Sequence, residues 1–493
     1  MTFRKQVATS AAWVGISTLI VKVLSFITIS LVLARVLEPG DFGLVGLAWL
    51  AINAFDFLRE LGITGALVYR QEDEDDAGVA ADVAYISLIG ASIVIYAIAF
   101  ISAPTIEKFF SDANGLAAIL RVLALTMLIN AVGQVPYTLM AKRLDFRNKA
   151  IPEIIAGIGN SIVAITMALN GFGAWSLVGG YITDSILRNL LVWFFTSWRP
   201  RLRFRRHVWQ EMLDYGKHLV SSRVLIFGIT NIDDAMIGRV LGAESLGFYT
   251  LAYRLSNLPA THITKLISNV MFPAFSKIQR EQERIRHIFF QTVHAVGLIA
   301  IPLSVATVVL GPNFVHNYYL GRWDNATIAM QWLTLYGFMR AIAANMGPIL
   351  KAMGKPQWIS ALALGRLVVM AALLYPAILW KGIVGVSILS AVVAIIDFGI
   401  AAWMTRKLIG GSYSTYLRVL GPATLTAFLA AGVAWLTLPL VPHIHRLFPL
   451  LIASLVMVVL YVGIMWWADD LFRQLSISAM NRFGPTRSLA ARL

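Results

Sequence analysis

The sequence contains no cysteine among its 493 residues. This absence excludes disulfide bonds, thiolate metal sites and cysteine nucleophiles. Charged residues are scarce, at 14% of the chain, whereas a soluble domain carries about 25%. Hydrophobic residues make up 58%, and apolar runs of about 18 residues or more recur along the whole length. The composition therefore predicts an all-α polytopic membrane protein with almost no soluble part.

The apolar runs predict fourteen membrane-spanning helices joined by short loops. The first run is too long for the core of a signal peptide, and no small-residue cleavage site follows it, so we interpret it as a permanent helix. The expected spans are 9–34, 42–67, 79–103, 116–140, 150–170, 174–196, 212–236, 246–274, 287–311, 326–350, 357–378, 382–405, 416–438 and 447–468.

The positive charge has an uneven distribution along these spans. The net charge is +15. If the N-terminus lies in the cytoplasm, inside segments hold roughly four times as many lysines and arginines as outside segments. This asymmetry predicts that both termini are cytoplasmic. The most basic run, "WRPRLRFRRH" (198–207), lies between spans six and seven beside tryptophan and phenylalanine. Such a composition attracts anionic lipid headgroups. Nucleic-acid binding is not expected, because the loops leave no room for a folded basic face.

Short loop motifs recur half a chain apart. "ARVLEPGDFG" (34–43) and "GRVLGAESLG" (238–247) share an Arg-Val-Leu-(five residues)-Gly frame. "QVPYTLMAKR" (134–143) resembles "MGPILKAMGK" (346–355), and "GFGAWSLV" (171–178) resembles "GIVGVSIL" (382–389). The pattern predicts two six-span lobes in parallel repeat, residues 1–205 and 206–410, then two extra helices (411–470) and a basic tail (471–493). Transporters built from parallel repeats hold substrate near mid-membrane at the repeat interface, and rocking of the two lobes would give alternating access.

Three short sequence segments resemble those of one transporter family. The first loop motif, "LGITGALVYR" (61–70) and "IGRVLG…LGFYTLAYRLSNLP" (237–259) are similar to Wzx-type polysaccharide flippases, the colanic-acid-exporter-like branch of the multidrug/oligosaccharidyl-lipid/polysaccharide (MOP) superfamily. The resemblance covers about residues 1–410. It implies a V-shaped two-lobe fold in the bacterial inner membrane. It also implies transfer of undecaprenyl-pyrophosphate-linked oligosaccharide units from the cytoplasmic to the periplasmic leaflet, alongside polysaccharide polymerase machinery.

Ten cations lie within the expected spans. Arg121 and Lys217 are close enough to a span end to reach the interface, and Arg188 follows Asp184 by one helical turn, which predicts an ion pair. Each remaining cation would cost about 2.5–3.5 kcal/mol if it faced lipid at mid-membrane. We therefore expect a hydrated cationic cavity that binds an anion such as pyrophosphate. The seven candidate substrate-binding residues are Lys22, Arg59, Arg223, Arg254, Lys265, Arg340 and Arg366.

The family resemblance bears most directly on three of these cations. In the related lipid II flippases, cations on spans one, two and eight bind the pyrophosphate, which implies this role for Lys22, Arg59 and Arg254. Lysine stands at position 22 where that branch usually has arginine. Arg59 has a structural alternative, neutralisation by Asp56. Lys265 lies on the same expected span as Arg254.

The acids and one proline in the spans are candidates for coupling and gating. No GxxxxGK[ST] motif is present, so we expect no ATP hydrolysis and no bound cofactor, and coupling to an H⁺ or Na⁺ gradient or to the membrane potential. Asp56, Glu60 and Asp397 are deep enough to carry a coupling ion, although each could equally be a counter-ion. Pro259 would bend span eight, either as a gating kink or as a static bend.

Three other functions remain open. A multidrug exporter for cationic compounds is disfavoured by a cationic cavity. A lipid II flippase would share the fold and the anion site. A membrane glycosyltransferase or polymerase would need acidic residues at a water interface, for which Asp233 and Asp234 are the one hint. This pair is better interpreted as a helix-end feature, so we expect a transporter and not an enzyme.

Overall fold

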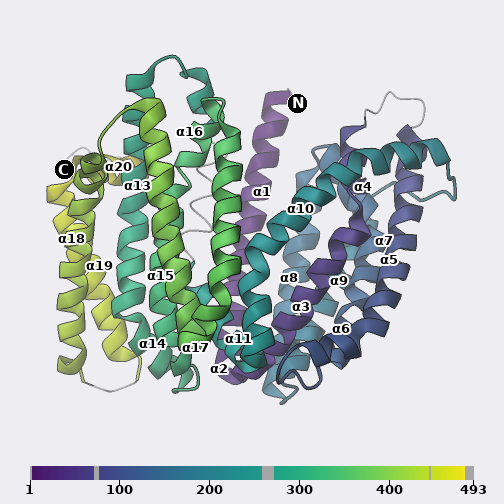
Figure 1. The fold of residues 1–493 in the computed structure, drawn as a ribbon, viewed down its shortest axis with the longest axis horizontal. Helices are drawn as coiled ribbons and strands as arrows, with labels where there is room; N and C mark the ends of the chain where they lie inside the picture. The colour runs from purple at the N-terminus through teal and green to yellow at the C-terminus, as the bar shows by residue number, and fades with distance from the viewer. Residues whose placement is uncertain (1–2, 71–76, 258–270, 443–445, 484–493) are drawn as a thin grey trace. The chain divides into compact units, whose positions relative to one another are not determined.

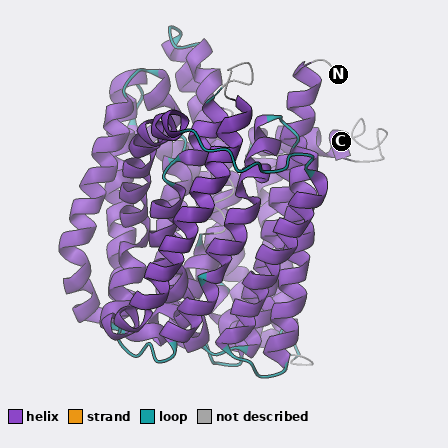
Figure 2. Ribbon diagram, turned by 90° about the vertical axis from the view of Figure 1, so that its right-hand side faces the viewer, coloured by secondary structure: helices purple, strands orange, loops and turns teal. Residues whose placement is uncertain are grey.

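The structure is a computed structural model that describes residues 3–70, 77–257, 271–442 and 446–483 (Figure 1). The regular elements in these ranges are all helices, and no strand occurs among them (Figure 2). The chain divides into two compact units, Met1–Thr250 and Leu251–Leu493. The all-helical class expected from the composition is confirmed.

The first unit contains eleven described helices and the start of a twelfth. They are α1 (Phe3–Ser25), the π-helix η1 (Phe26–Leu33), α2 (Ala34–Val36), α3 (Pro39–Glu60), α4 (Ile63–Tyr69), α5 (Ala77–Phe109), α6 (Leu116–Leu123), α7 (Leu125–Lys142), α8 (Phe146–Leu169), α9 (Ala174–Phe195) and α10 (Arg206–Val240), followed by α11 (Gly242–Ser256). Helix α8 packs against α1 and α9, and α7 packs against α5 and α9. Helix α10 packs against α3, α4 and α5, so it belongs to this unit.

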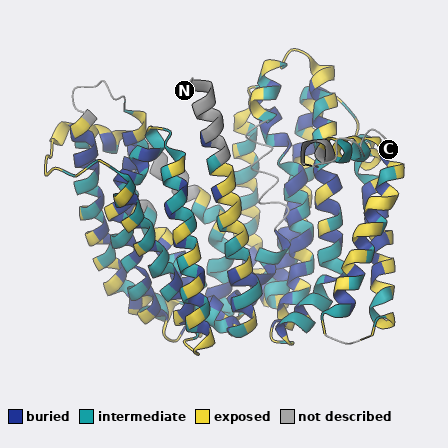
Figure 3. Ribbon diagram, turned by 180° about the vertical axis from the view of Figure 1, so that it is seen from behind, coloured by how far each residue is buried: buried dark blue, intermediate teal, exposed yellow. Residues whose placement is uncertain are grey.

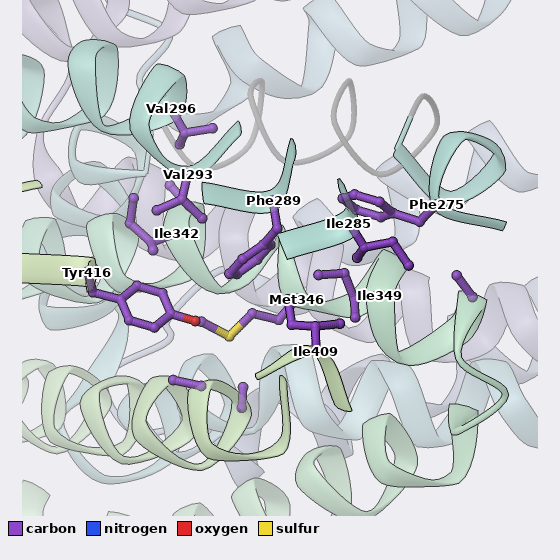
Figure 4. Close-up of a cluster of buried hydrophobic side chains, with 14 of the residues drawn as sticks. Phe275, Ile285, Phe289, Val293, Val296, Ile342, Met346, Ile349, Ile409 and Tyr416 are labelled. Carbon is purple, nitrogen blue, oxygen red and sulfur yellow. The ribbon is translucent and has the colours of Figure 1, made fainter. Parts of the chain in front are cut away.

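The second unit is built around a long helical hairpin. Its helices are α13 (Gln282–Val309), α14 (Gly311–Tyr319), η2 (Asp324–Ala326), α15 (Thr327–Ala343), α16 (Met346–Ala352), α17 (Pro356–Ile409), α18 (Tyr413–Thr437), η3 (Leu438–Leu440), α19 (Phe448–Ala468) and α20 (Asp470–Phe483). Non-helical backbone at Lys381 and Gly382 divides α17 into two arms. A core cluster around Phe289, Met346 and Tyr416 joins α13, α16 and α18 (Figure 4).

The helix surfaces suit a lipid environment. Nine helices among the described residues are long and apolar enough to cross a membrane, and α17 is one of them with both of its arms. Large apolar side chains remain exposed, for example Ile101 at 75% and Phe194 at 80% (Figure 3). Apolar exposure of this extent is the normal state of a lipid-facing helix. The chain is thus a multi-pass membrane protein, while the count of fourteen spans stays a prediction.

The backbone repeats at, or within two residues of, the positions where the sequence repeats. Leu37 donates its N–H to Leu33 and Leu241 donates to Ile237, both at 2.8 Å. The ends of α7 and α16 share a second pattern, with left-handed backbone at Leu144 (φ 58°) and at Gly354 (φ 70°). Gly173 and Gly382 share nearly the same unusual conformation, with φ/ψ of 52°/−133° and 56°/−135°. These matches support a repeated architecture, although the lobe boundaries at 205 and 410 stay predictions.

The two copies of the first loop motif meet inside the first unit. A Cβ atom added to Gly43 of α3 would lie 1.6 Å from the carbonyl oxygen of Ala243. A Cβ added to Gly247 of α11 would lie 1.9 Å from the carbonyl oxygen of Pro39. Gly43 and Gly247 are equivalent in the repeat, and so are Pro39 and Ala243. Helices α3 and α11 therefore cross by a symmetric backbone contact that only glycine permits.

Candidate functional site

Arg59 lies in the last turn of α3, next to a break in the second expected span. Its Nε donates to Oδ1 of Asp56 at 2.6 Å, and the arginine side chain is 6% exposed. One terminal nitrogen is buried with no hydrogen-bond partner in the structure as described. The pair neutralises the charge of Arg59, as the sequence allowed, and leaves a guanidinium N–H group with unused bonding capacity.

The break beside Arg59 comes from two left-handed residues. Leu61 has φ 47° and Gly62 has φ 69°. A Cβ at Gly62 would lie 2.4 Å from Cα of Gly216, so the break sits directly against the backbone of α10. Glu60, just before the break, accepts a hydrogen bond from the hydroxyl of Thr64 in α4. The three residues Asp56, Arg59 and Glu60 therefore lie together at a helix discontinuity, where a spanning helix can expose polar backbone.

Lys22 lies in the last turn of α1, just before the π-helix η1. Its side chain is exposed, and it has no hydrogen-bond or ion-pair partner among the residues that the structure describes. π-Helical turns are uncommon and frequently mark functional sites. Lys22 thus lies, without an acid partner in the described residues, beside an irregular segment of the first span.

Arg340, in the last turn of α15, is held by neutral groups. Its Nη1 donates to the hydroxyl of Tyr253 at 3.0 Å and to the hydroxyl of Tyr336 at 3.3 Å. The guanidinium also lies over the Tyr336 ring, 5.2 Å from its centroid. Within the described ranges no carboxylate forms an ion pair with Arg340. The tyrosines accept hydrogen bonds from Nη1 without cancelling the charge of the guanidinium.

Arg254 follows Tyr253 on α11, in the last turn of that helix. It is half-buried, and in the described parts of the chain it has no ion-pair or hydrogen-bond partner. The tyrosine beside it holds Arg340. Two cations of the second unit are therefore tied to one short helix segment, and neither is neutralised by an acid there.

Arg366 and Asp397 face each other across the hairpin of α17. The shortest distance between Nη1 and Oδ2 is 3.7 Å, and the side chains are 33% and 23% exposed. They line a cavity of about 270 Å³ whose other walls are aliphatic, including Val369 and Ile396. The sequence analysis proposed substrate binding for the arginine and ion coupling for the acid. The structure brings the two candidates together as one pair.

Some of the remaining predicted residues lie outside the described part of the chain, and others form contacts that the structure shows. Pro259 and Lys265 lie outside the described residues, and so does the side chain of Arg223 on α10. The predicted Asp184–Arg188 ion pair is confirmed. Asp233 is one of the two acids that would be needed if the protein were a glycosyltransferase or polymerase. It accepts a hydrogen bond from the hydroxyl of Tyr249 at 2.7 Å.

Sequence reasoning missed the two tyrosines around Arg340. Tyr336 precedes Arg340 by one helical turn, which was a usable signal because such residues meet on one helix face. Tyr253 lies on another helix, 87 residues before Arg340 in the sequence. The spacing of residues within one helix cannot predict such a contact.

Solved structures of similar fold belong to one class of membrane transporter. The structure of the lipid II flippase MurJ in an inward closed conformation aligns with a TM-score of 0.74 at 13% identity, covering 94% of this chain and 99% of that one. An inward-facing multidrug resistance MATE family transporter of the MOP superfamily aligns with a TM-score of 0.59 at 15% identity, covering 78% and 94%. The chain therefore has the fold that these two transporters share.

The family within this class is also defined. The model of the polysaccharide biosynthesis protein family matches residues 32–328, and the chain belongs to that family. The lipopolysaccharide biosynthesis protein WzxC of Escherichia coli (strain K12) is 27% identical, over 85% of this chain and 84% of that protein. The teichuronic acid biosynthesis protein TuaB of Bacillus subtilis (strain 168) is 25% identical, over 87% and 89%. The succinoglycan biosynthesis transport protein ExoT of Rhizobium meliloti (strain 1021) is 24% identical, over 71% and 70%. These findings confirm the resemblance seen in the loop motifs.

Proposed function

We propose that the protein is a flippase that moves undecaprenyl-pyrophosphate-linked oligosaccharide units from the cytoplasmic to the periplasmic leaflet of the bacterial inner membrane. The family, the relatives in polysaccharide synthesis and the MOP fold support transport of such a substrate. The Lys and Arg asymmetry supports cytoplasmic termini. The lipid-linked unit would be the substrate, and membrane lipids and a polysaccharide polymerase would be the neighbouring partners.

The observation that carries the proposal is the environment of Arg340. A cation within a spanning segment is costly unless it is paired or hydrated. Two phenol hydroxyls accept its hydrogen bonds, but they leave its positive charge in place. Lys22 and Arg254 likewise have no acid partner in the described residues. Cations that no acid of the described residues neutralises fit an anionic ligand, and guanidinium groups bind phosphate oxygens through paired N–H donors.

Coupling would use an H⁺ or Na⁺ gradient or the membrane potential. The carboxylates in place for this are Asp56, Glu60 and Asp397. Two of them hold arginines, so binding of a proton or sodium ion at either acid would release a guanidinium toward the substrate. Binding of the ion and binding of the pyrophosphate would then support each other.

A deletion strain of the source bacterium tests the function. Lipid-linked oligosaccharide should accumulate in the cytoplasmic leaflet of the deletion strain, and the native gene should restore its transfer. Loss of one charged hydrogen-bond donor to phosphate costs about 1.5–3 kcal/mol, so Arg340→Gln should weaken apparent affinity by about 10- to 150-fold. The matched control is Arg121→Gln, because Arg121 is an arginine of an expected span that donates to the backbone carbonyl of Phe100 and is not a candidate substrate-binding residue.

The other outcomes identify the alternatives. Complete absence of lipid-linked units in the deletion strain would indicate an enzyme that synthesises them. Normal glycan with increased drug sensitivity would indicate a multidrug exporter. Arrested peptidoglycan synthesis with normal surface polysaccharide would indicate a lipid II flippase.

A further inference from the structure

The connection between α9 and α10 is fixed although it has no regular structure. Residues 196–205 form no helix or strand. Asp82 of α5 holds the middle of this loop: its Oδ1 accepts the backbone N–H of Arg201 at 3.0 Å and its Oδ2 accepts Nε of Arg203 at 2.7 Å. Arg203 also donates to the carbonyl of Gly78 at 3.3 Å. The loop is thereby tied to the end of α5 at three points.

Asp82 is the buried part of this anchor. It is 1% exposed, and an ionised carboxylate is costly to bury unless charged hydrogen bonds compensate it. Both oxygens are used for the loop and for nothing else that the structure describes. We therefore interpret the buried carboxylate of Asp82 as the group that holds residues 201–203 in one conformation.

Aromatic side chains form the base of the loop. Trp193 and Trp198 stack with ring centroids 6.0 Å apart, and Tyr85 packs edge-on against Trp198 at 5.7 Å. Arg199 lies over Trp193, 5.5 Å from the ring centroid. Tryptophan and tyrosine concentrate where a spanning helix leaves the hydrocarbon for the headgroups. This places the loop at headgroup level.

The outer side of the loop combines apolar and cationic groups. Leu202 is 92% exposed and Phe204 is 52% exposed. The exposed side chains of Arg201 and Arg206 have no hydrogen-bond or ion-pair partner in the described residues. An acidic protein would complement the arginines, but it would leave Leu202 unexplained. A leaflet of anionic phospholipid complements both, because the headgroups bind guanidinium and the acyl boundary takes the leucine.

We propose that residues 196–206, pinned by Asp82, are a preformed docking surface for the anionic phospholipid headgroups of the adjoining leaflet. Leu202 inserts below the headgroups, while Arg201 and Arg206 contact their phosphates. Asp82 is a positioning residue, because it presents this surface without touching lipid. The surface shares no residue with the proposed pyrophosphate site, and the proposal does not depend on the transport function.

The absence of native cysteine makes a single-site reporter possible. Leu202→Cys labelled with a polarity-sensitive dye, in the full chain in nanodiscs, should show blue-shifted emission and quenching by brominated lipid. Both signals should be strong with phosphatidylglycerol present and weak in pure phosphatidylcholine. Leu169→Cys is the matched control, since Leu169 is 68% exposed and no arginine occurs between positions 148 and 187, so its response should not depend on lipid charge.

Charge and anchor variants separate the two parts of the proposal. Each arginine near an anionic surface contributes about a fivefold preference, so Arg201→Gln with Arg206→Gln should reduce the phosphatidylglycerol preference by about 30-fold. Asp82→Asn should reduce it while leaving the arginines present. If Asp82→Asn does not fold, Arg203→Gln removes the same anchor from the exposed side.

Three results would overturn the proposal. One is equal quenching at Leu202→Cys in phosphatidylglycerol and phosphatidylcholine nanodiscs. Another is an unchanged lipid preference after both arginines are replaced. The third is a reporter that stays in water in every nanodisc and becomes buried only when an acidic protein is added, which would make the surface a protein-docking site.

Discussion

The crossing of α3 and α11 predicts an unusually large effect of adding one methyl group. In Gly43→Ala, the new Cβ would lie 1.6 Å from the carbonyl oxygen of Ala243. Carbon contacts are optimal at about 3.5–4.0 Å, so the two helices would have to separate by about 2 Å there. The atom in the way is backbone, which cannot rotate aside as a side chain can.

The size of the effect follows from the same contact. Overpacking of this kind costs about 1–3 kcal/mol. That free energy disfavours the conformation in which the helices cross, and it shifts the population by about 5- to 150-fold toward any conformation in which they are apart. Gly247→Ala should have the same effect, because its Cβ would meet the equivalent carbonyl of Pro39 at 1.9 Å. The double variant should cost little more than either single variant, since one separation relieves both clashes.

Cross-linking measures this separation directly. Cysteines introduced at Gly46 and Leu246 lie close together at the crossing, because a Cβ on Gly46 would contact the Leu246 side chain at 3.6 Å. A short bifunctional thiol reagent should link them efficiently in the native background and poorly with Gly43→Ala. Gly40→Ala is the matched control, since a Cβ there meets no atom within 4 Å. Efficient cross-linking with Gly43→Ala, or additive effects of the two glycine variants, would refute the reasoning.

Three further predictions concern the site. Tyr336→Phe should lower the free energy of unfolding by about 0.5–1.5 kcal/mol, the usual contribution of one hydrogen bond. The same substitution should have no further effect in the Arg340→Gln background, and equal effects in both backgrounds would show that the two side chains do not interact. Gly62→Ala should lower both stability and transport, because it needs a left-handed φ of 69° and meets the backbone of α10 at 2.4 Å, whereas Gly90→Ala, with open space around it, should be tolerated; similar thermal shifts of the two would contradict this. Asp397→Asn should preserve substrate binding but abolish gradient-driven transport, and an equal loss of both would assign this acid a structural role.

The repeat could be predicted from sequence, but its register could not be read correctly everywhere. The first loop has the same offset in sequence and structure, because glycine is required at Gly43 and Gly247 alike. At the end of α7, left-handed backbone falls on Leu144, whereas the equivalent position near α16 is Gly354. The two positions share a backbone conformation but carry different residues, so a comparison of the two sequence segments cannot identify them as equivalent. The sequence comparison that pairs Pro136 with Pro348 is therefore shifted by two residues from the structural comparison that pairs Leu144 with Gly354.

The candidate cations could be selected from the sequence because the cost of a lipid-facing cation in a membrane is large. Their partners were only partly predictable. Asp56 and Arg59 are three residues apart on one helix, so their contact is visible in the sequence. The contact between Arg340 and Tyr253 joins two helices, and Arg366 meets Asp397 only because α17 folds back at Gly382. Such contacts depend on the packing of helices, which hydrophobic periodicity does not specify.

The difference between the partners determines which cations are available to a substrate. A phosphate that took Arg59 away from Asp56 would displace a charged hydrogen bond, worth about 1.5–3 kcal/mol, and water can replace only part of it because Asp56 is 43% exposed while Arg59 is 6% exposed. A phosphate that took Arg340 away from a tyrosine would displace a hydrogen bond worth about 0.5–1.5 kcal/mol, which the phenol can replace with water. Arg340, Arg254 and Lys22 are therefore each available to a phosphate at lower cost than Arg59. Arg59 becomes available at low cost only when Asp56 has bound a proton or a sodium ion, so the pair at the end of α3 would link substrate binding to the ion gradient.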